Sequence, residues 1–189
     1  EAAGRVAEVG HGVKKFAEGD PVIVSLIRTC GQCRACRRGQ DVACTGEIDL
    51  NSKSPLVDKN GVRVAQGLNV GAFATQVVVH KSQIVPLPDD VNLMAASLLG
   101  CGVLTGSGAI TNTARVAAGD AVVVMGCGGV GVGAIQAARL AGAAQIVAVD
   151  PAATKRTAAV GFGATHTADP TNSDLAEVIT DATGGRLAD

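Results

Sequence analysis

The chain has 189 residues, of which 47% are hydrophobic and 17% are charged, and it contains 25 glycines but no tryptophan or tyrosine. This much apolar material excludes global disorder, because the chain has ample surface to bury. The formal net charge of −1 gives no overall attraction to nucleic acid or to an anionic membrane surface. Two uncharged stretches, 91–114 and 121–138, are interrupted by glycine and polar residues, so we expect buried elements of a soluble protein and not membrane spans.

The first ninety residues predict short β-strands separated by turns. Runs rich in β-branched residues occupy 5–10, 21–27 and 73–79 and have the length of strands. The turns contain glycine, proline or aspartate, and they lie at 10–12, 18–20, 59–61 and 86–90. We therefore predict a β-rich first domain with one cysteine-rich excursion.

From Asp90 onward the pattern changes to strands that alternate with helices. Residues 94–110 are small and apolar and favour helix, and the continuous apolar run 121–125 is typical of a strand buried on both faces. A loop and a helix follow over 126–142. The later predicted elements are strands at 145–150 and 164–168 and helices at 155–160 and 173–182. This order predicts an α/β fold with a doubly wound parallel sheet and right-handed crossovers.

Four of the six cysteines crowd into one short segment. Four thiolates at such spacings can close a tetrahedral zinc site completely, which would give the metal a structural role. The alternatives that the sequence leaves open are two disulfides, buried free thiols or an iron–sulfur cluster. The four predicted ligands are Cys30, Cys33, Cys36 and Cys44.

The same segment is basic, which raises nucleic-acid binding as another alternative. No aromatic residue lies nearby for base stacking, so a solvated loop is the favoured interpretation. The arginines in and beside the segment are Arg28, Arg34, Arg37 and Arg38.

A second motif, Gly-Cys-Gly-Gly-Val-Gly at 126–131, matches the G-x-G-x-x-G pattern of dinucleotide-binding loops. It follows a predicted buried strand and opens a predicted helix, which is the context that the pattern requires. The first glycine would make the tight turn, the second would admit the pyrophosphate, and the third would let the helix pack close to the strand. The predicted cofactor-binding residues of the loop are Gly126, Gly128, Gly129, Val130 and Gly131.

Asp150 ends the next predicted strand. Its carboxylate would accept hydrogen bonds from the adenosine ribose hydroxyls and would repel a 2′-phosphate, which favours NAD over NADP. Lys155 either flanks the same ribose or is a plain solvated lysine. The alternative for the whole motif is a glycine-rich turn that binds no ligand.

The remaining cysteines and histidines carry no pattern by themselves. Cys101 and Cys127 stand alone, and spacing favours small core residues for both. No histidine has a partner at metal-ligand spacing, so we interpret His11, His80 and His166 as structural or surface residues.

Taken in order, these motifs resemble the zinc-dependent medium-chain alcohol dehydrogenase family. The resemblance covers essentially the whole chain. It rests on the opening EAAG with VAEVG, the cysteine cluster, GCGVLTG at 100–106, GCGGVG at 126–131 and AVD at 148–150. It leans toward the formaldehyde-dehydrogenase-like branch, in which a thiol adduct is oxidised. The resemblance implies a GroES-like β-rich catalytic domain followed by a Rossmann domain that binds NAD.

The resemblance also implies roles that spacing alone does not indicate. Cys101 would be a ligand of a catalytic zinc, Glu1 would be the acidic residue close to that zinc, and Thr105 would lie beside the nicotinamide. Together these three residues would be the catalytic set. Lys155 would contact the adenosine ribose.

The implied domains are residues 1–103, the GroES-like domain with a structural-zinc lobe at 29–45, and residues 104–189, the NAD-binding domain. Family members take two further ligands for the catalytic zinc, a cysteine and a histidine, from sequence before Glu1. They also continue the Rossmann domain beyond the last residue here. We therefore expect an internal fragment of a longer protein that is inactive as a catalyst by itself.

The predicted function of the parent protein is reversible oxidation of an alcohol to an aldehyde, with hydride transfer to NAD and with structural and catalytic zinc. The expected partner is a small alcohol or aldehyde. We expect no nucleic-acid partner and no membrane partner. The parent protein is expected to be a homodimer or homotetramer in the cytoplasm. The alternative function is that of a non-catalytic zinc protein that binds a nucleotide.

Overall fold

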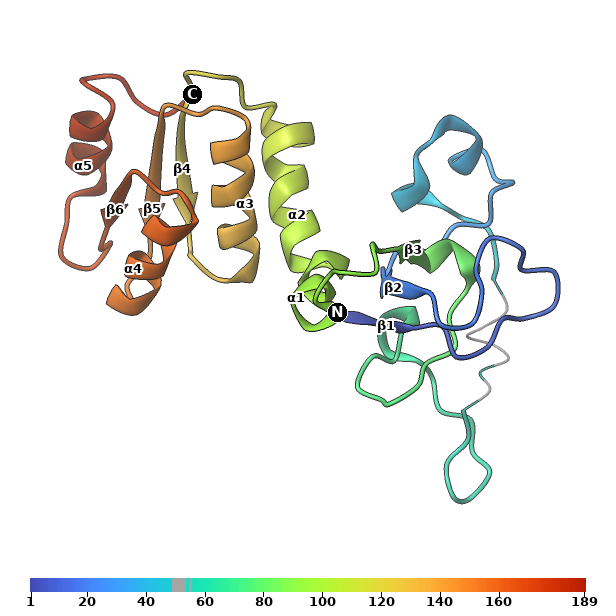
Figure 1. The fold of residues 1–189 in the computed structure, drawn as a ribbon. Helices are drawn as coiled ribbons and strands as arrows, with labels where there is room; N and C mark the ends of the chain where they lie inside the picture. The colour runs from blue at the N-terminus through green and yellow to red at the C-terminus, as the bar shows by residue number, and fades with distance from the viewer. Residues whose placement is uncertain (49–53, 55) are drawn as a thin grey trace. The chain divides into compact units, whose positions relative to one another are not determined.

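The computed structural model describes residues 1–48, 54 and 56–189 (Figure 1). Residue contacts divide the chain into two compact units, Glu1–Cys101 and Gly102–Asp189. The assignment of folding domains from the sequence, with its boundary after residue 103, stays a proposal.

A three-stranded antiparallel sheet organises the first unit (Figure 1). The central strand β2 (Pro21–Val24) pairs with β1 (Ala2–Arg5) on one side and with β3 (Ile84–Pro86) on the other. The Cα register places Ile23 opposite both Ala3 and Val85. Strand β2 is the most buried of the three, with Val22 and Val24 in the core.

Two of the predicted strands in this unit are wrong, and the third is confirmed only in part. The predicted strand 21–27 forms its ladder over its first four residues. In place of the strand predicted at 5–10, the chain forms β1 over residues 2–5. Strand β1 ends at Arg5 because its partner β2 begins at Pro21, and the chain turns just before Pro21, where Val6 N–H donates to Asp20 O at 3.0 Å. The run 73–79 forms no strand, because β2 pairs instead with β3, which begins just before the predicted turn 86–90.

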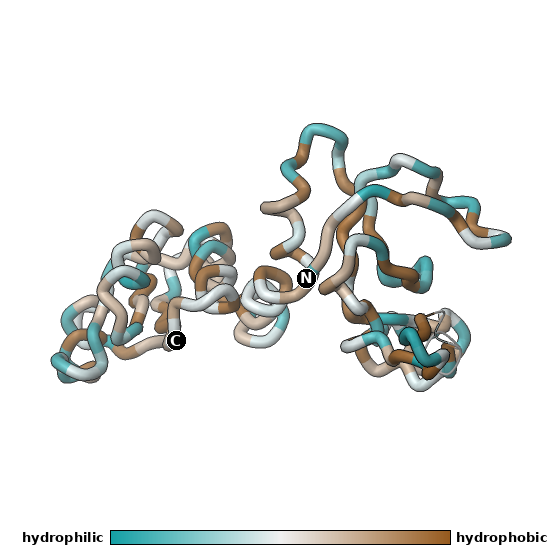
Figure 2. Tube along the Cα trace, turned by 90° about the horizontal axis from the view of Figure 1, so that it is seen from below, coloured by the Kyte–Doolittle hydropathy of each residue, from teal (hydrophilic) through white to brown (hydrophobic). Residues whose placement is uncertain are grey.

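Short helices connect the strands of the first unit. The Asn92 side chain caps α1 (Leu93–Ser97) by accepting a hydrogen bond from Ala95 N–H at 3.1 Å. The remaining helices are single 3₁₀ turns, namely η1 (Cys36–Arg38), η2 (Asp41–Ala43), η3 (Gly67–Asn69), η4 (Lys81–Gln83) and η5 (Leu98–Gly100). Figure 2 shows hydrophobic residues along many parts of the Cα trace.

The second unit is built on a parallel sheet with the order β4-β5-β6, which confirms the predicted fold class. The strands are β4 (Ala121–Met125), β5 (Gln145–Val149) and β6 (His166–Ala168). The helices are α2 (Gly102–Gly108), which continues into a π-helical turn η6 (Ala109–Ala114), α3 (Gly129–Leu140), α4 (Ala153–Phe162) and α5 (Leu175–Ala182).

Helices cover both faces of this sheet, as a doubly wound arrangement requires. Along β5, Ile146 and Ala148 belong to the core that contains residues of α3 and α4. The alternate residues Val147 and Val149 belong to a second core that packs against α5. Because β5 is buried on both faces, its residues 146–149 are all apolar, which is the pattern that identified it.

Glycines allow helices α2 and α3 to approach closely. A Cβ atom on Gly106 would overlap Val130 O and would lie 2.6 Å from Ala134 N, and one on Gly133 would lie 2.9 Å from Val103 Cα. No other residue fits at these contacts unless the helices move apart.

No single helix in the described part of the chain is long and apolar enough to cross a membrane. The consecutive segments Leu93–Gly100 and Gly102–Ala114 reach the necessary length and hydropathy only when they are taken together across the bend between them.

Replacement of Gly106 by alanine is expected to lower the free energy of unfolding by about 1–3 kcal/mol, because the added methyl group forces α2 away from α3. Gly161, in α4, is a matched control, since a Cβ atom there meets nothing within 4 Å. Gly161→Ala is expected to raise the free energy of unfolding by about 0.5–1 kcal/mol. Urea denaturation measures both changes, and a Gly106→Ala variant as stable as Gly161→Ala would contradict the packing.

Candidate metal centre and nucleotide-binding loop

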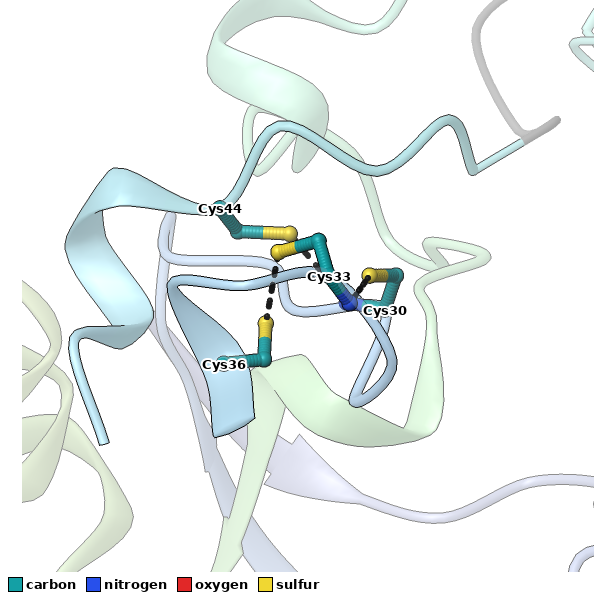
Figure 3. A group of neighbouring side chains, drawn as sticks. All are labelled: Cys30, Cys33, Cys36 and Cys44. Atoms are coloured by element: carbon teal, nitrogen blue, oxygen red, sulfur yellow. Dashed lines mark hydrogen bonds between the residues drawn. The ribbon is translucent and has the colours of Figure 1, made fainter. Parts of the chain in front are cut away.

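The structure brings the four clustered cysteines together. Cys30 lies in the loop after β2, Cys36 begins η1, and Cys44 directly follows η2, with Cys33 in the turn between the first two. Figure 3 shows their side chains converging, and the four Sγ atoms all lie within 4.8 Å of one another. This is the only group of three or more candidate metal ligands among the described residues.

Hydrogen bonds favour thiolates at two of these positions. Cys30 Sγ accepts bonds from the amides of Gln32 at 3.4 Å and Cys33 at 3.3 Å, and these bonds lower the pKa of Cys30. Amide hydrogen bonds, first from Cys36 and then from Thr45, lower the pKa of Cys33 to about 5. Desolvation instead raises the pKa of Cys36 to about 12. A cation is therefore needed before all four sulfurs can carry negative charge side by side.

The donor set fits zinc. Thiolates at about 2.3 Å from a tetrahedral zinc ion lie about 3.8 Å apart, which agrees with the observed clustering. The sulfurs are not joined as disulfides. Four protein ligands leave no open position, so the bound metal would have a structural role. The neighbouring arginines Arg34, Arg37 and Arg38 are exposed, as expected for a solvated loop.

Gly46 is part of this centre, although the sequence analysis did not single it out. A Cβ atom at this position would overlap Cys30 Sγ and would lie 2.5 Å from Cys30 Cβ. The chain passes so close to the cluster that only glycine fits. The sequence signal that could have identified Gly46 is its position two residues after Cys44, the last cysteine of the cluster.

The glycine-rich loop joins β4 to α3. Gly126 follows the last residue of β4 with a φ of 94°, a left-handed conformation that favours glycine. A Cβ atom on Gly131 would overlap the carbonyl oxygen of Gly126, so only glycine lets α3 begin this close to the strand end. Gly128 caps α3, and a Cβ atom there would meet nothing within 4 Å. The loop thus presents the start of a helix with open space in front of it, which suits an anionic phosphate group.

Asp150, directly after β5, is hydrogen-bonded to this loop. Its side chain accepts bonds from Cys127 N–H at 2.9 Å and from Ala152 N–H at 2.8 Å, and the residue is only 4% exposed. These two amides, and then the charges of Lys155 and Arg156, lower the pKa of Asp150. The structure therefore assigns the carboxylate a partner that the sequence did not predict, the glycine loop itself.

Two cations follow Asp150 in α4. Lys155 is largely exposed, with Nζ 3.9 Å from the Asp150 carboxylate. Arg156 donates from Nη1 to the main-chain oxygens of Asp150 at 2.6 Å and Pro151 at 2.8 Å, and it pairs with Asp169 at 3.2 Å. The sequence analysis missed Arg156 and Asp169. The signal for Asp169 was its position directly after the third parallel strand, because loops that follow parallel strands meet at one edge of the sheet.

The catalytic residues that the resemblance implies come from both compact units. Cys101 is half-buried at the end of the first unit and belongs to no group of three donors among the described residues. Glu1 and Thr105 are exposed. Their assigned roles therefore stay proposals.

Two of the isolated histidines and Cys127 have local partners. His80 Nδ1 lies 2.9 Å from Ser82 Oγ and caps η4, and burial lowers the pKa of His80. His166 Nδ1 lies 2.9 Å from Thr165 Oγ1, and His11 is exposed. Cys127 is buried beside Asp150, and burial raises its pKa. These contacts need no ligand to explain them.

The chain is expected to bind one zinc ion, which Cys36→Ser should release because it removes a thiolate ligand. Gly46→Ala should also weaken zinc binding, because the methyl group displaces Cys30 Sγ. Metal analysis after dialysis measures both losses. Gly10→Ala is the control, since a Cβ atom at Gly10 meets nothing within 4 Å. Full zinc retention by Cys36→Ser would exclude the proposed ligand set.

Acid is expected to destabilise the second unit. The pKa values of Asp150 and Asp169 lie below the ordinary 3.8, so the folded state binds fewer protons than the unfolded state in acid. The stabilisation is complete above the unfolded pKa and is lost as the pH falls through the lowered folded values. The urea midpoint should be constant near neutral pH and should fall below about pH 4. The urea midpoint of Asp169→Asn should fall less steeply with decreasing pH than that of the unmodified chain. An equal or steeper fall would contradict the lowered pKa of Asp169.

Comparison with known proteins adds two family matches. The family described as "Alcohol dehydrogenase GroES-like domain" matches residues 1–89. The family described as "Zinc-binding dehydrogenase" matches residues 129–189. The two matches cover both compact units in the expected order.

Curated relatives and solved structures agree with these matches. "Alcohol dehydrogenase B" of Mycobacterium tuberculosis is 40% identical over all of this chain and 52% of its own length. An "S-(hydroxymethyl)glutathione dehydrogenase" of a Synechocystis species is 36% identical over 97% of this chain and 52% of its own length. The chain thus spans about half the length of the curated relatives that it matches.

Among solved structures, an alcohol dehydrogenase zinc-binding domain protein from Burkholderia ambifaria is similar with a TM-score of 0.87 and 32% identity, over 98% of this chain and 52% of that one. Benzyl alcohol dehydrogenase from Acinetobacter calcoaceticus is similar with a TM-score of 0.83 and 29% identity, over 98% of this chain and 51% of that one. The cysteine centre, the glycine loop and these similarities together show that the chain belongs to the zinc-dependent medium-chain alcohol dehydrogenase family.

Proposed function

We propose that this chain supplies the structural-zinc lobe and the NAD-binding core of an alcohol dehydrogenase, which transfers a hydride between an alcohol and NAD. The observation that carries this proposal is the glycine loop 126–131, whose backbone is hydrogen-bonded to the carboxylate of Asp150. That pairing supports a phosphate site at the helix start and a ribose-binding role for the acid beside it, at one edge of a parallel sheet. The family to which the chain belongs supports it.

The loop would hold the pyrophosphate of the cofactor. Gly126 and Gly131 fix the turn, and Gly128 leaves open space through which the phosphates reach the backbone. Gly129 and Val130 open α3, whose first amides point out of the helix end. When bound, NAD supplies the group that accepts and returns the hydride.

The acid after β5 would select NAD over NADP. Asp150 is nearly buried and its pKa is lowered, so it stays ionised at neutral pH. Its charge would accept hydrogen bonds from the ribose diol and repel a phosphate on the 2′ position. Lys155, 3.9 Å from this carboxylate and largely exposed, would cover the same ribose. A relative from Sinorhizobium meliloti, similar with a TM-score of 0.71 and 28% identity over 93% of this chain and 46% of that one, was solved bound to NADP, so the choice within the family needs a direct test.

For the catalytic zinc we propose only one ligand from this chain, Cys101. The described residues do not form a complete site around it, so no step of the reaction is derived through that metal. Thr105 would line the nicotinamide end of the cofactor, and Glu1 would lie near the catalytic metal. The zinc held by the four clustered cysteines would only brace the lobe 29–45.

The substrate would be a small alcohol or its aldehyde. One curated relative is named for a thiol adduct, S-(hydroxymethyl)glutathione, and one solved relative for benzyl alcohol, so both substrate classes belong in a first screen. We also propose a cytoplasmic location and a homodimer or homotetramer for the whole protein. Light scattering measures that assembly directly.

A second candidate function is a non-catalytic zinc protein that binds a nucleotide. The observation that favours it is that Cys101 belongs to no group of three or more candidate metal ligands in the described part of the chain. The two functions differ in turnover: the dehydrogenase forms NADH from NAD and an alcohol, and the binding protein takes up NADH without turnover.

Asp150→Asn is expected to weaken NADH binding by about tenfold, because a hydrogen bond to a charged group contributes about 1.5–3 kcal/mol. The same change should strengthen NADPH binding, since the repelling charge is removed. Calorimetric titration of the chain with each nucleotide measures both changes in affinity.

Asp189→Asn is the matched control, because Asp189 accepts a hydrogen bond from Ala121 N–H at the other end of β4, away from the glycine loop. It should leave both affinities unchanged. If Asp150→Asn binds NADH as tightly as the unmodified chain, the proposed ribose contact is wrong.

A further inference from the structure

Arg156 joins the ends of two neighbouring strands. Its Nη1 atom donates to the main-chain oxygens of Asp150 and Pro151, which directly follow β5, and lies 3.2 Å from Asp169 Oδ2, directly after β6. One guanidinium group therefore ties together the loops that leave the carboxyl ends of β5 and β6.

The position of this arginine is unfavourable for the helix that carries it. Helix α4 begins without a side-chain cap and without an acidic residue in its first turn, and Lys155 and Arg156 both lie there. Positive charge at a helix N-terminus opposes the helix dipole. The Arg156 side chain is only 19% exposed, so Asp169 and the two carbonyl groups compensate its charge in place of water.

Asp169 is itself held in place for this contact. Its carboxylate accepts hydrogen bonds from the amide and the hydroxyl of Thr171, at 3.0 and 2.6 Å, and from the Asn172 side chain at 3.3 Å. These bonds, with the nearby Arg156, lower the pKa of Asp169. The acid is therefore a fixed anchor, and not a mobile surface group that happens to meet an arginine.

Asp150 is consequently fixed through both its side chain and its backbone. The side chain accepts from Cys127 N–H and Ala152 N–H, while the main-chain oxygen accepts from Arg156 and the main-chain N–H donates to Ala168 O at 3.2 Å. The two backbone bonds set the direction in which the Asp150 carboxylate leaves the chain.

We propose that Arg156 is a positioning residue of the nucleotide site, which clamps the end of β5 to Asp169 and thereby holds the Asp150 carboxylate in the orientation that receives the cofactor ribose. This inference rests on the nucleotide function proposed above. In this proposal Arg156 acts through Asp150 and not through a contact of its own with the nucleotide.

The test compares two ligands that differ only at the ribose that Asp150 would bind. NADH and its 2′-deoxyadenosine analogue are titrated against the unmodified chain and Arg156→Ala. The variant should raise the Kd for NADH about three- to tenfold, an effect of the size of one lost hydrogen bond. It should raise the Kd for the 2′-deoxy analogue by a smaller factor, because that ligand has lost one of the two ribose hydroxyls from which Asp150 would accept a hydrogen bond. A general structural role would weaken both ligands equally.

Three further variants sharpen the comparison. Arg139→Ala removes an exposed arginine from the last turn of α3 and should change neither Kd. Arg156→Lys keeps the charge opposite Asp169 but loses the planar fork, and it should restore part of the NADH affinity. Asp169→Asn should weaken NADH binding in the same direction, and its effect should not add to that of Arg156→Ala, since both changes break one contact.

The outcomes separate this inference from the proposed function. If the unmodified chain fails to bind NADH, the proposed function is wrong and the inference falls with it. If the unmodified chain binds NADH but Arg156→Ala changes neither Kd, or raises both by the same factor, only the inference is overturned. Should Arg156→Ala fail to fold, Arg156→Lys and Asp169→Asn carry the same two-ligand comparison.

Discussion

The hydrogen bond from the Cys127 amide to the Asp150 carboxylate joins the ends of β4 and β5 at 2.9 Å. The rest of the proposed nucleotide site depends on it. It holds the glycine loop against the neighbouring strand, and it keeps a nearly buried carboxylate ionised, since the amide lowers the pKa of Asp150. Arg156 and Asp169 extend the same connection to the end of β6. All three strand ends are thus tied together before any ligand binds, so the site is preorganised and a ligand need not order it.

The cysteine centre depends on a different constraint, the repulsion between neighbouring thiolates. Amide hydrogen bonds favour ionised sulfur at Cys30 and Cys33, whereas desolvation opposes it at Cys36. A dication would resolve this conflict, so we expect the fold of the lobe to depend on bound metal. The chain closes around the cluster so tightly that a Cβ atom on Gly46 would overlap Cys30 Sγ. The two sites therefore differ in kind: hydrogen bonds within the protein hold one, whereas the other needs its metal.

The parallel sheet was predictable because the local sequence indicates its first two strands. Residues 121–125 and 146–149 are continuously apolar, as is typical of strands that pack on both faces of a sheet, and the glycines between them mark the start of α3. The strands of the first unit give no such signal. The valine-rich run 73–79 is a better strand by composition than Ile84–Pro86, yet only the latter pairs with β2. Antiparallel pairing depends on partners that are distant in the sequence, and β-propensity cannot supply them.

The sequence by itself determined the residue types and their order: four cysteines at zinc-binding spacing, a glycine-rich loop between two buried strands, and an acid at the end of the second strand. These follow from local geometry, because short spacings and strand–turn–helix units bring their residues together without help from the rest of the chain. Only the tertiary structure decided which groups meet across strand ends. The partners of Asp150 are the Cys127 amide and, through its backbone, Arg156, and Asp169 becomes part of the same network. Such contacts depend on the register and the twist of neighbouring strands, which no single segment encodes.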